Sequence, residues 1–325
     1  MNKTVKQFSL INLKGISQIM LQENKITGLL FFLGIFYSSW LMAIGLIIGT
    51  ILGSVVGYLL TDKNNKALSQ GLYGFNAALI GIIITYLYGL SPYSILCIIV
   101  ASVFATLFMH FAVIKNIPVF TFPFVVLSWV VVSFVNTTNL MPVVERPTSD
   151  EIFLQQPTVK LFKEKLLQMG IRLDGDNIQD DLIYSTHGFG QVMFQGSFIA
   201  GLLFLVGVYV NKPIAALYGI FASILAITLS RLLNSPESSI AAGMFSFSAV
   251  LCAVAIAGTR RRDGFLVVIS TLLTVVIGIL LLKIGIAPYT FPFVATMWIL
   301  LLSQKGVRFI ENFFGLKKVS NRVLK

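Results

Sequence analysis

The sequence contains very little charge. Charged residues make up 11% of the 325-residue chain, hydrophobic residues make up 56%, and the mean hydropathy is +0.88. Soluble domains carry about 25% charged residues, so this composition excludes a soluble globular protein and indicates a polytopic membrane protein. The net charge of +11 comes from basic residues at the ends of apolar segments and in the tail. There they control topology next to anionic lipid, and we do not expect nucleic-acid binding.

Cysteine and histidine are almost absent. Cys97 and Cys252 lie within apolar segments, where we expect packing roles and neither a disulfide nor a metal site. The two histidines, His110 and His187, are far apart in the sequence, and the sequence has no metal-ligand spacing, Ser-His-acid set or Gly-rich phosphate loop. We therefore predict that the protein is not an enzyme and uses no metal or other cofactor.

Acidic residues are also scarce inside the apolar segments. Glu23 and Glu237 lie near segment ends. Ion-coupled transporters usually need a buried carboxylate to carry a proton or to help bind sodium. The scarcity favours a path for a neutral solute, although neutral side chains and backbone carbonyls can also bind sodium.

Nine apolar runs approach or exceed the roughly 20 residues that cross a bilayer as a helix. The first run is long enough for two passes, with a break around Ser38 and Ser39. This gives five spans before residue 136 and five after residue 187. The runs are residues 26–60, 71–89, 93–114, 118–135, 192–210, 213–233, 240–257, 265–286 and 290–302.

An odd number of spans in each half places the second half upside down relative to the first. With the N-terminus in the cytoplasm, 17 of the 24 basic residues fall on the cytoplasmic side, including Arg260, Arg261 and Arg262 in one short loop. We therefore predict an all-α polytopic membrane protein with two inverted repeats of about five transmembrane helices each. Broken or re-entrant helices would surround a central pore, and both termini would be cytoplasmic.

A polar segment separates the two halves. Residues 136–187 carry eight acidic and five basic residues and several Pro and Gly, which indicates an extracytoplasmic connector with a short helix around Val159 to Met169. The other predicted parts are a cytoplasmic N-terminal segment (1–14), the first repeat (15–135), the second repeat (188–304) and a basic cytoplasmic tail (305–325).

Three motifs occur in both halves and in the same order. GISQIMLQENKITGLLFFLG (15–34) matches GFGQVMFQGSFIAGLLFLVG (188–207), which places Gln18 opposite Gln191. GLYGFNAAL matches GMFSFSAVL, and IPVFTFPF matches APYTFPF. The offsets between paired residues, 173, 172 and 169, are nearly constant, so one duplication explains all three motifs. The second and third motifs pair Phe75 with Phe247, Leu79 with Leu251 and Thr121 with Thr290.

These motifs resemble those of the urea transporters, in which GLYGFN-like and LPVFTLPF-like sequences recur in both halves and a G-x-x-Q segment opens each half. The resemblance covers nearly everything outside the termini and the connector. It implies that each protomer forms its own pore along a pseudo-two-fold axis, and that three protomers form a homotrimer. It further implies passive, channel-like urea permeation, which we expect in a plasma membrane.

The paired residues suit a selectivity filter for urea, which is flat and neutral and has four N–H donors and one carbonyl acceptor. Removing its water without replacing the hydrogen bonds costs several kcal/mol. The hydrogen bonds to water can be replaced by glutamines at the two mouths, threonines at the centre and backbone carbonyls freed near the prolines. Paired Phe and Leu side chains form a flat slot that rejects hydrated ions. The predicted pore residues are Gln18, Phe75, Leu79, Thr121, Gln191, Val192, Phe194, Phe247, Leu251 and Thr290.

Each predicted pore residue could instead have a purely structural role. Phe and Leu in a span usually face lipid or a neighbouring helix, and Thr usually bonds to its own helix backbone. Gln18 and Gln191 can instead cap or line an interfacial amphipathic helix. The chain also departs from the family pattern, because Ser246 and Ser248 replace the usual Gly and Asn in the second half, and Leu21 stands opposite Phe194. The two mouths are therefore expected to differ.

Two other functions remain open at this point. Inverted repeats with broken helices also describe an ion-coupled secondary transporter of another small neutral polar solute, such as a short amide or ammonia. A receptor or scaffold of the same fold would show binding without flux. Collapsing the proton and sodium gradients separates a channel, whose flux persists, from a coupled carrier, whose uphill accumulation stops.

Overall fold

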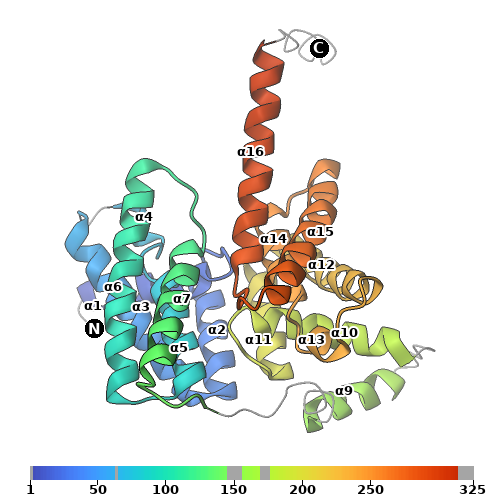
Figure 1. Ribbon diagram of the computed structural model, residues 1–325, viewed down its shortest axis with the longest axis horizontal. Coiled ribbons are helices and arrows are strands. Elements are labelled where there is room, and N and C mark those ends of the chain that lie inside the picture. Colours follow the sequence, from blue (N-terminus) through green and yellow to red (C-terminus); the bar gives the residue numbers. More distant parts are fainter. Residues whose placement is uncertain (1–2, 63–64, 145–155, 169–175, 314–325) are drawn as a thin grey trace.

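The computed structural model describes residues 3–62, 65–144, 156–168 and 176–313, and all regular structure in these ranges is helical. Figure 1 shows two helical halves side by side, one formed by α1 to α7 and the other by α10 to α16, with α9 next to the second half. The predicted all-α fold is confirmed.

The helices of the first half are α1 (Lys3–Gln18), α2 (Lys25–Ser38), α3 (Trp40–Leu60), α4 (Lys66–Ser69), α5 (Phe75–Tyr88), α6 (Pro92–Lys115) and α7 (Phe122–Thr138). The remaining helices are α9 (Pro157–Gln168), α10 (Asp176–Gln191), α11 (Phe198–Asn211), α12 (Pro213–Leu232), α13 (Glu237–Ala241), α14 (Ser246–Ile256), α15 (Arg261–Lys283) and α16 (Phe291–Phe313).

The two halves correspond helix by helix, from α1 with α10 to α7 with α16. Helices α1 and α10 are both 16 residues long, and their bounds differ by the same offset of 173 that relates the sequence motifs. The duplicated unit therefore includes α1, most of which the sequence analysis placed in a separate N-terminal segment. The predicted boundaries after residues 14, 187 and 304 fall inside α1, α10 and α16, so the helices continue across them.

The break predicted in the first apolar run lies at Ser39, which ends α2 and caps α3. Its extended backbone (φ −158°) interrupts the helix, and its side chain accepts a hydrogen bond from the backbone N–H of Met42 at 3.4 Å. A serine oxygen thereby satisfies an N–H group that the start of a helix leaves free.

The ten predicted spans divide into two classes. Among the residues that the structure describes, five helical segments are long and apolar enough to cross a membrane, whereas five apolar helices are shorter. At about 1.5 Å per residue, a 14-residue helix such as α2 or α5 rises only about 21 Å, less than the roughly 30 Å of a hydrocarbon core. Short helices joined to non-helical loops are the broken-helix pattern that lines polar paths in transporters.

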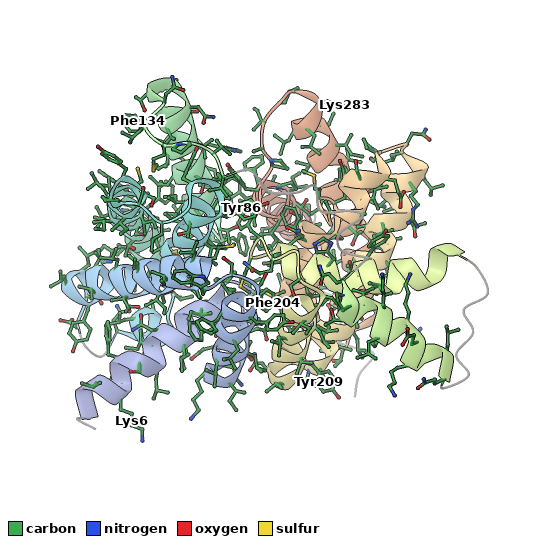
Figure 2. All side chains as sticks on the ribbon, turned by 90° about the horizontal axis from the view of Figure 1, so that it is seen from below. Lys6, Tyr86, Phe134, Phe204, Tyr209 and Lys283 are labelled. Carbon is green, nitrogen blue, oxygen red and sulfur yellow. The ribbon has the colours of Figure 1, made fainter. Side chains whose placement is uncertain are left out.

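Helices α2 and α11 form a reciprocal contact between the halves. The rings of Phe31 and Phe204 meet edge to face with centroids 5.2 Å apart, and Figure 2 shows Phe204 at the boundary between the halves. Each ring also packs on a glycine of the other helix: a Cβ on Gly34 would lie 2.6 Å from Phe204, and one on Gly207 would lie 2.7 Å from Phe31. These glycines permit the close approach.

Large apolar side chains cover the outside of the molecule. Leu59 is 79% exposed, Phe265 is 72% exposed, and Phe134 lies at the edge in Figure 2. Such a surface suits lipid, because a hydrocarbon environment does not penalise exposed apolar groups. The fold thus agrees with the membrane protein predicted from composition.

The connector contains the short helix that its sequence predicts. Helix α9 covers Pro157–Gln168, while Met169, the predicted end, lies outside the described residues. Val159 is fully buried, and the ring of Phe162 packs 5.2 Å from that of Phe198 at the start of α11. The connector therefore packs on the second half.

Candidate functional site

Thr121 and Thr290 meet where the two halves join. Their Oγ1 atoms are 2.7 Å apart and form a hydrogen bond, and both side chains are buried, with exposures of 3% and 1%. Each threonine stands directly before the first residue of a helix, Thr121 before α7 and Thr290 before α16. Two equivalent threonines, 169 residues apart in sequence, thus place their hydroxyls in contact at the junction of the halves.

The loops before these threonines have matching, strained backbones. Phe120 and Tyr289 occupy the left-handed region with φ of +50° and +40°. Left-handed backbone costs a non-glycine residue roughly 1–2 kcal/mol, so surrounding contacts must hold it in place. Two such sets of contacts are visible.

The first set is a pair of reciprocal tryptophan clamps. The indole Nε1–H of Trp129 donates to the carbonyl of Ala287 at 2.8 Å, and that of Trp298 donates to the carbonyl of Pro118 at 2.8 Å. Each helix after a central threonine thereby holds the loop before the other threonine. We did not predict these residues, although both tryptophans stand eight positions after the paired threonines and the sequence carried that signal.

The second set depends on Asn76 and occurs in one half only. Its Nδ2 donates to the carbonyl of Phe120 at 3.3 Å, and its Oδ1 accepts from the backbone N–H of Phe124 at 3.2 Å. The counterpart in the second half is Ser248, whose Oγ is buried without a hydrogen-bond partner among the described residues. The shorter hydroxyl does not reproduce the asparagine's role, so the two sides of the centre are held differently.

A cavity of about 700 Å³ opens on the second half. Of the predicted pore residues, Gln191, Phe194 and Phe247 line it, and Tyr289, next to Thr290, lines it as well. Several of its wall residues were not predicted from the sequence, and they come from the first half, the connector and loops of the second half. These include Tyr37, Ser38, Ser39, Met42, Tyr86, Gln156, Gln195, Ser197 and Met244.

Phe194 stands in an aromatic group at this mouth. Its ring centroid lies 5.6 Å from that of Tyr86 and 6.3 Å from those of Phe124 and Tyr289. Leu21, its counterpart, has the same left-handed backbone, with φ of +58° at both positions. The backbone geometry is therefore duplicated while the aromatic side chain is not, as the sequence comparison indicated.

The carboxamide of Gln191 is oriented by His187. His187 is fully buried, with Nδ1 2.7 Å from the carbonyl of Ala241 and Nε2 2.8 Å from Nε2 of Gln191. A carbonyl can only accept, so Nδ1 carries the proton, and in the neutral ring Nε2 accepts from the Gln191 amide. This places the Gln191 nitrogen at the histidine and leaves its oxygen as an acceptor for a solute in the cavity.

Gln18 ends α1 in the equivalent position but has different neighbours. Its Nε2 donates to the backbone carbonyl of Gln70 at 3.0 Å, and it is not among the residues that line the cavity. Nearby, Glu23 accepts hydrogen bonds from Lys14 and from the Gln70 side chain, both at 2.9 Å. The Lys14 bond lowers the pKa of Glu23 below its usual value. One ion pair, between Lys14 and Glu23, thus lies near Gln18. The positions equivalent to Lys14, Glu23 and Gln70 in the second half hold His187, Gly196 and Ala242.

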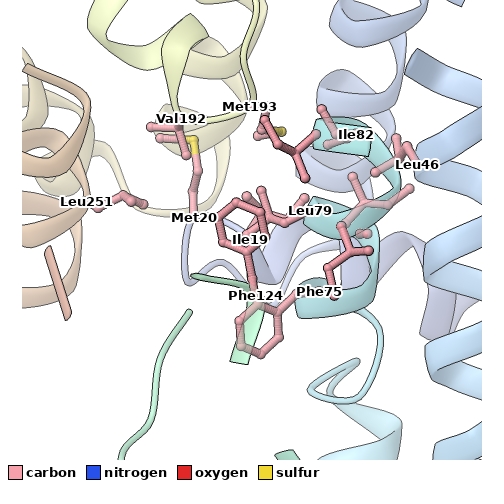
Figure 3. Packing of buried hydrophobic residues seen from close by; sticks show 14 of the residues in the cluster. Ile19, Met20, Leu46, Phe75, Leu79, Ile82, Phe124, Val192, Met193 and Leu251 are labelled. Carbon is pink, nitrogen blue, oxygen red and sulfur yellow. The ribbon is translucent and has the colours of Figure 1, made fainter. Parts of the chain in front are cut away.

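The remaining predicted pore residues lie in the core between the halves. Phe75, Leu79, Val192 and Leu251 are at most 4% exposed and belong to one buried cluster. Figure 3 shows Leu251 and Leu79 projecting from opposite halves, with Met20 and Val192 between them. Phe75 is thus more deeply buried than its counterpart Phe247, which reaches the cavity.

The centre and the cavity are chemically neutral. The cavity wall contains no Asp, Glu, Lys or Arg, and the described residues contain no group of three or more His, Cys, Asp or Glu side chains that could hold a metal ion. Hydroxyl, carboxamide and carbonyl groups supply its hydrogen bonds, and aromatic rings supply its apolar walls. Such a path suits a small polar molecule without charge.

Comparison with known proteins agrees with this geometry. The family model for urea transporters matches residues 10–305. Similar curated proteins include Urea transporter 1 of Ovis aries and of Capra hircus, each 25% identical over 321 residues that span 90% of this chain and 77% of the relative. Urea transporter 1 of Rattus norvegicus is 25% identical over 272 residues, covering 78% of this chain and 64% of the relative.

Proposed function

Because the chain belongs to the urea transporter family, we propose that it is a passive channel through which urea crosses the membrane between the two halves. The observation that carries the proposal is the hydrogen-bonded pair Thr121 and Thr290, which presents hydroxyls at the junction of the repeats. Urea reaching this point loses its water, and hydroxyls that both donate and accept replace part of that hydration.

The proposed filter places polar groups along an apolar slot. Gln191 serves one mouth and Gln18 the other, and their carboxamide oxygens accept from the N–H groups of urea. Phe75 and Phe247 flank the slot and stack against the flat solute, and Phe194 widens the aromatic surface at the cavity. Leu79, Val192 and Leu251 back the slot and exclude hydrated ions.

Passive transport is supported by the neutral character of this path. A proton-coupled carrier needs a group that changes charge during transport, and no carboxylate lines the cavity or contacts the central threonines among the described residues. We therefore place urea permeation ahead of coupled transport of a short amide or ammonia.

The proposed setting is a plasma membrane with both termini in the cytoplasm, and the distribution of basic residues supports the proposed orientation of the termini. The cavity on the second half then faces outward, beside the connector residue Gln156. We further propose a homotrimer with one pore in each protomer, based on the family resemblance.

Stopped-flow light scattering on proteoliposomes tests the function, with an imposed urea gradient, no ion gradient and protein-free liposomes as the control. Fast urea equilibration that mannitol and glycerol do not share supports a selective passive channel. Urea flux that folded protein does not accelerate contradicts it. In a second experiment with imposed proton and sodium gradients, uphill urea accumulation that stops when those gradients collapse also contradicts it.

Replacing both Thr121 and Thr290 with Val tests the central pair, because Val keeps the shape and removes both hydroxyls. Losing about 1 kcal/mol per hydrogen bond to the solute in transit predicts a roughly fivefold to 30-fold fall in urea flux. Unchanged urea flux in a correctly assembled double variant would show that the two hydroxyls do not contact urea in transit. Thr137→Val provides a matched control, because among the described residues this exposed hydroxyl bonds within its own helix, to the carbonyls of Ser133 and Phe134.

A further inference from the structure

Gln22 and Gln195 occupy equivalent positions, 173 residues apart, and have one side-chain hydrogen bond in common, while Nε2 of Gln195 also lies 3.7 Å from the sulfur of Met42. Nε2 of Gln22 donates to the carbonyl of Met20 at 2.8 Å, and Nε2 of Gln195 donates to the carbonyl of Met193 at 2.6 Å. Both side chains are buried, with exposures of 1% and 0%. The shared donor bond gives the two carboxamides the same orientation, so their oxygens point toward equivalent places.

Around Gln22, a polar triad completed by Asn211 of α11 in the second half satisfies the Gln22 oxygen. Nδ2 of Asn211 donates to Oε1 of Gln22 at 2.7 Å, and Nδ2 of Asn24 donates to Oδ1 of Asn211 at 3.2 Å. The carboxamide of Asn211 thus donates through its nitrogen and accepts through its oxygen. It uses both ends of a –CO–NH₂ group.

In the second half, both asparagines are replaced by serine. Ser38 stands in the position of Asn211, and Ser197 stands in the position of Asn24. Oε1 of Gln195 is buried without a hydrogen-bond partner in the described ranges. Ser38, Ser197 and Gln195 all line the 700 Å³ cavity, so the space of the missing carboxamide is continuous with that cavity.

We propose that this place is an additional binding subsite for urea or another primary amide, between Gln195, Ser38 and Ser197. A bound –CO–NH₂ group supplies what Asn211 supplies in the other half: its N–H donates to Gln195 Oε1, and its carbonyl accepts from the Ser197 hydroxyl. The subsite rests on the proposed function and adds to it a binding site that the solute occupies in the cavity before it enters the filter.

The chemistry of the wall favours an amide over an ion. An unpartnered buried acceptor calls for an N–H or O–H donor, and the cavity wall carries no formal charge that would attract a metal or an anion. Primary amides combine a donor and an acceptor at the spacing that the Asn211 carboxamide uses. A water molecule is the competing occupant and can satisfy the oxygen alone.

Soaking crystals of the full chain in selenourea distinguishes these occupants, because selenium scatters anomalously and water does not. We expect an anomalous peak beside Gln195 in the wild-type protein. The peak should be lost in the double variant Ser38→Asn and Ser197→Asn, whose side chains rebuild the triad and fill the space. A peak in the filter alone, a water in the subsite, or no peak at all overturns the subsite.

The opposite exchange is the matched control. In the double variant Asn24→Ser and Asn211→Ser, the first half loses its triad, and a new peak is expected beside Gln22. Serine at position 24 retains an oxygen to cap α2, as Asn24 does through bonds from the N–H groups of Ile26 and Thr27. If the anomalous peak beside Gln195 seen in the wild-type protein is also present in the double variant Ser38→Asn and Ser197→Asn, the proposal is likewise overturned.

Urea flux in proteoliposomes separates this inference from the proposed function. If the wild-type protein conducts urea and the soak shows no peak at Gln195, the subsite alone is wrong. If the wild-type protein conducts no urea, the channel function is wrong. A peak at Gln195 in that case still establishes an amide-binding site.

Discussion

Changing Asn76 to Ser should remove from the first half two hydrogen bonds that the second half, with Ser248 at the equivalent position, already lacks. The two Asn76 bonds hold the backbone at Phe120 and Phe124, on either side of Thr121. A serine at position 76 is too short to reach either group, as the unpartnered hydroxyl of Ser248 indicates. We therefore expect both a loss of stability and a loss of urea flux.

The magnitude follows from the two bonds. Each neutral hydrogen bond contributes about 1 kcal/mol net, and a buried group left unpaired costs about 1–3 kcal/mol. Asn76 is 1% exposed, so water does not readily replace it, while bond lengths of 3.2 and 3.3 Å place the effect near the lower end of that range. Asn76→Ser should reduce the free energy of unfolding by about 2 kcal/mol. The reciprocal Ser248→Asn should raise it by about 1 kcal/mol.

Reversible unfolding by SDS in mixed micelles, followed by tryptophan fluorescence, measures these free energies, and stopped-flow scattering measures the flux. Asn136→Ser, at an exposed position on α7, serves as the control and should stay within about 0.5 kcal/mol of the wild type. The reasoning is refuted if Asn76→Ser matches this control in both stability and flux. It is also refuted if Ser248→Asn destabilises the protein as much as Asn76→Ser does.

Three further changes test other contacts. His187→Leu removes the acceptor that orients Gln191 and should lower urea flux about fivefold, whereas His187→Gln, which retains an acceptor, should preserve more than half of it; equal fluxes in the two variants contradict the positioning role. Trp298→Phe removes the indole bond to Pro118 and should cost about 1 kcal/mol of unfolding free energy while leaving the secondary structure by circular dichroism unchanged. Phe204→Ala empties the contact between α2 and α11 and should cost about 3–5 kcal/mol in the same SDS assay, so a loss below about 1 kcal/mol would mean that this contact does not hold the halves together.

Local sequence signals predicted the elements that depend on neighbouring residues. Ser39 breaks the first apolar run because a serine there caps the following helix, and Pro157–Gln168 forms a helix in the connector. Pairing of the repeats also brought Thr121 and Thr290 into correspondence, and the structure shows them in direct contact. The break and the connector helix are confirmed because short-range pattern leaves a trace in the linear sequence, and duplication leaves one in the pairing of the threonines, whose role in the pore stays a prediction.

Contacts between distant segments were not predictable in the same way. The indole bond from Trp298 to Pro118 spans 180 residues, and the orientation of Gln191 depends on a histidine that the sequence marked only as isolated. The equal length and constant offset of α1 and α10 are visible only in the structure, because the aligned motifs begin at Gly15 and Gly188, inside these helices. Pattern alone does not report which carbonyl a donor will reach.

The sequence by itself determined that the protein lies in a membrane, that its fold is duplicated and helical, and which residues form pairs. Composition and periodicity decide these properties, because burial in lipid acts on whole segments. The sequence indicated that the two mouths differ, but only the tertiary structure decided how: the ion pair of Lys14 and Glu23 lies near one, and a neutral cavity with a Gln195 oxygen that has no partner among the described residues lies at the other. That difference arises from side-chain length and angstrom-scale reach between segments far apart in the chain, which the order of residues does not display.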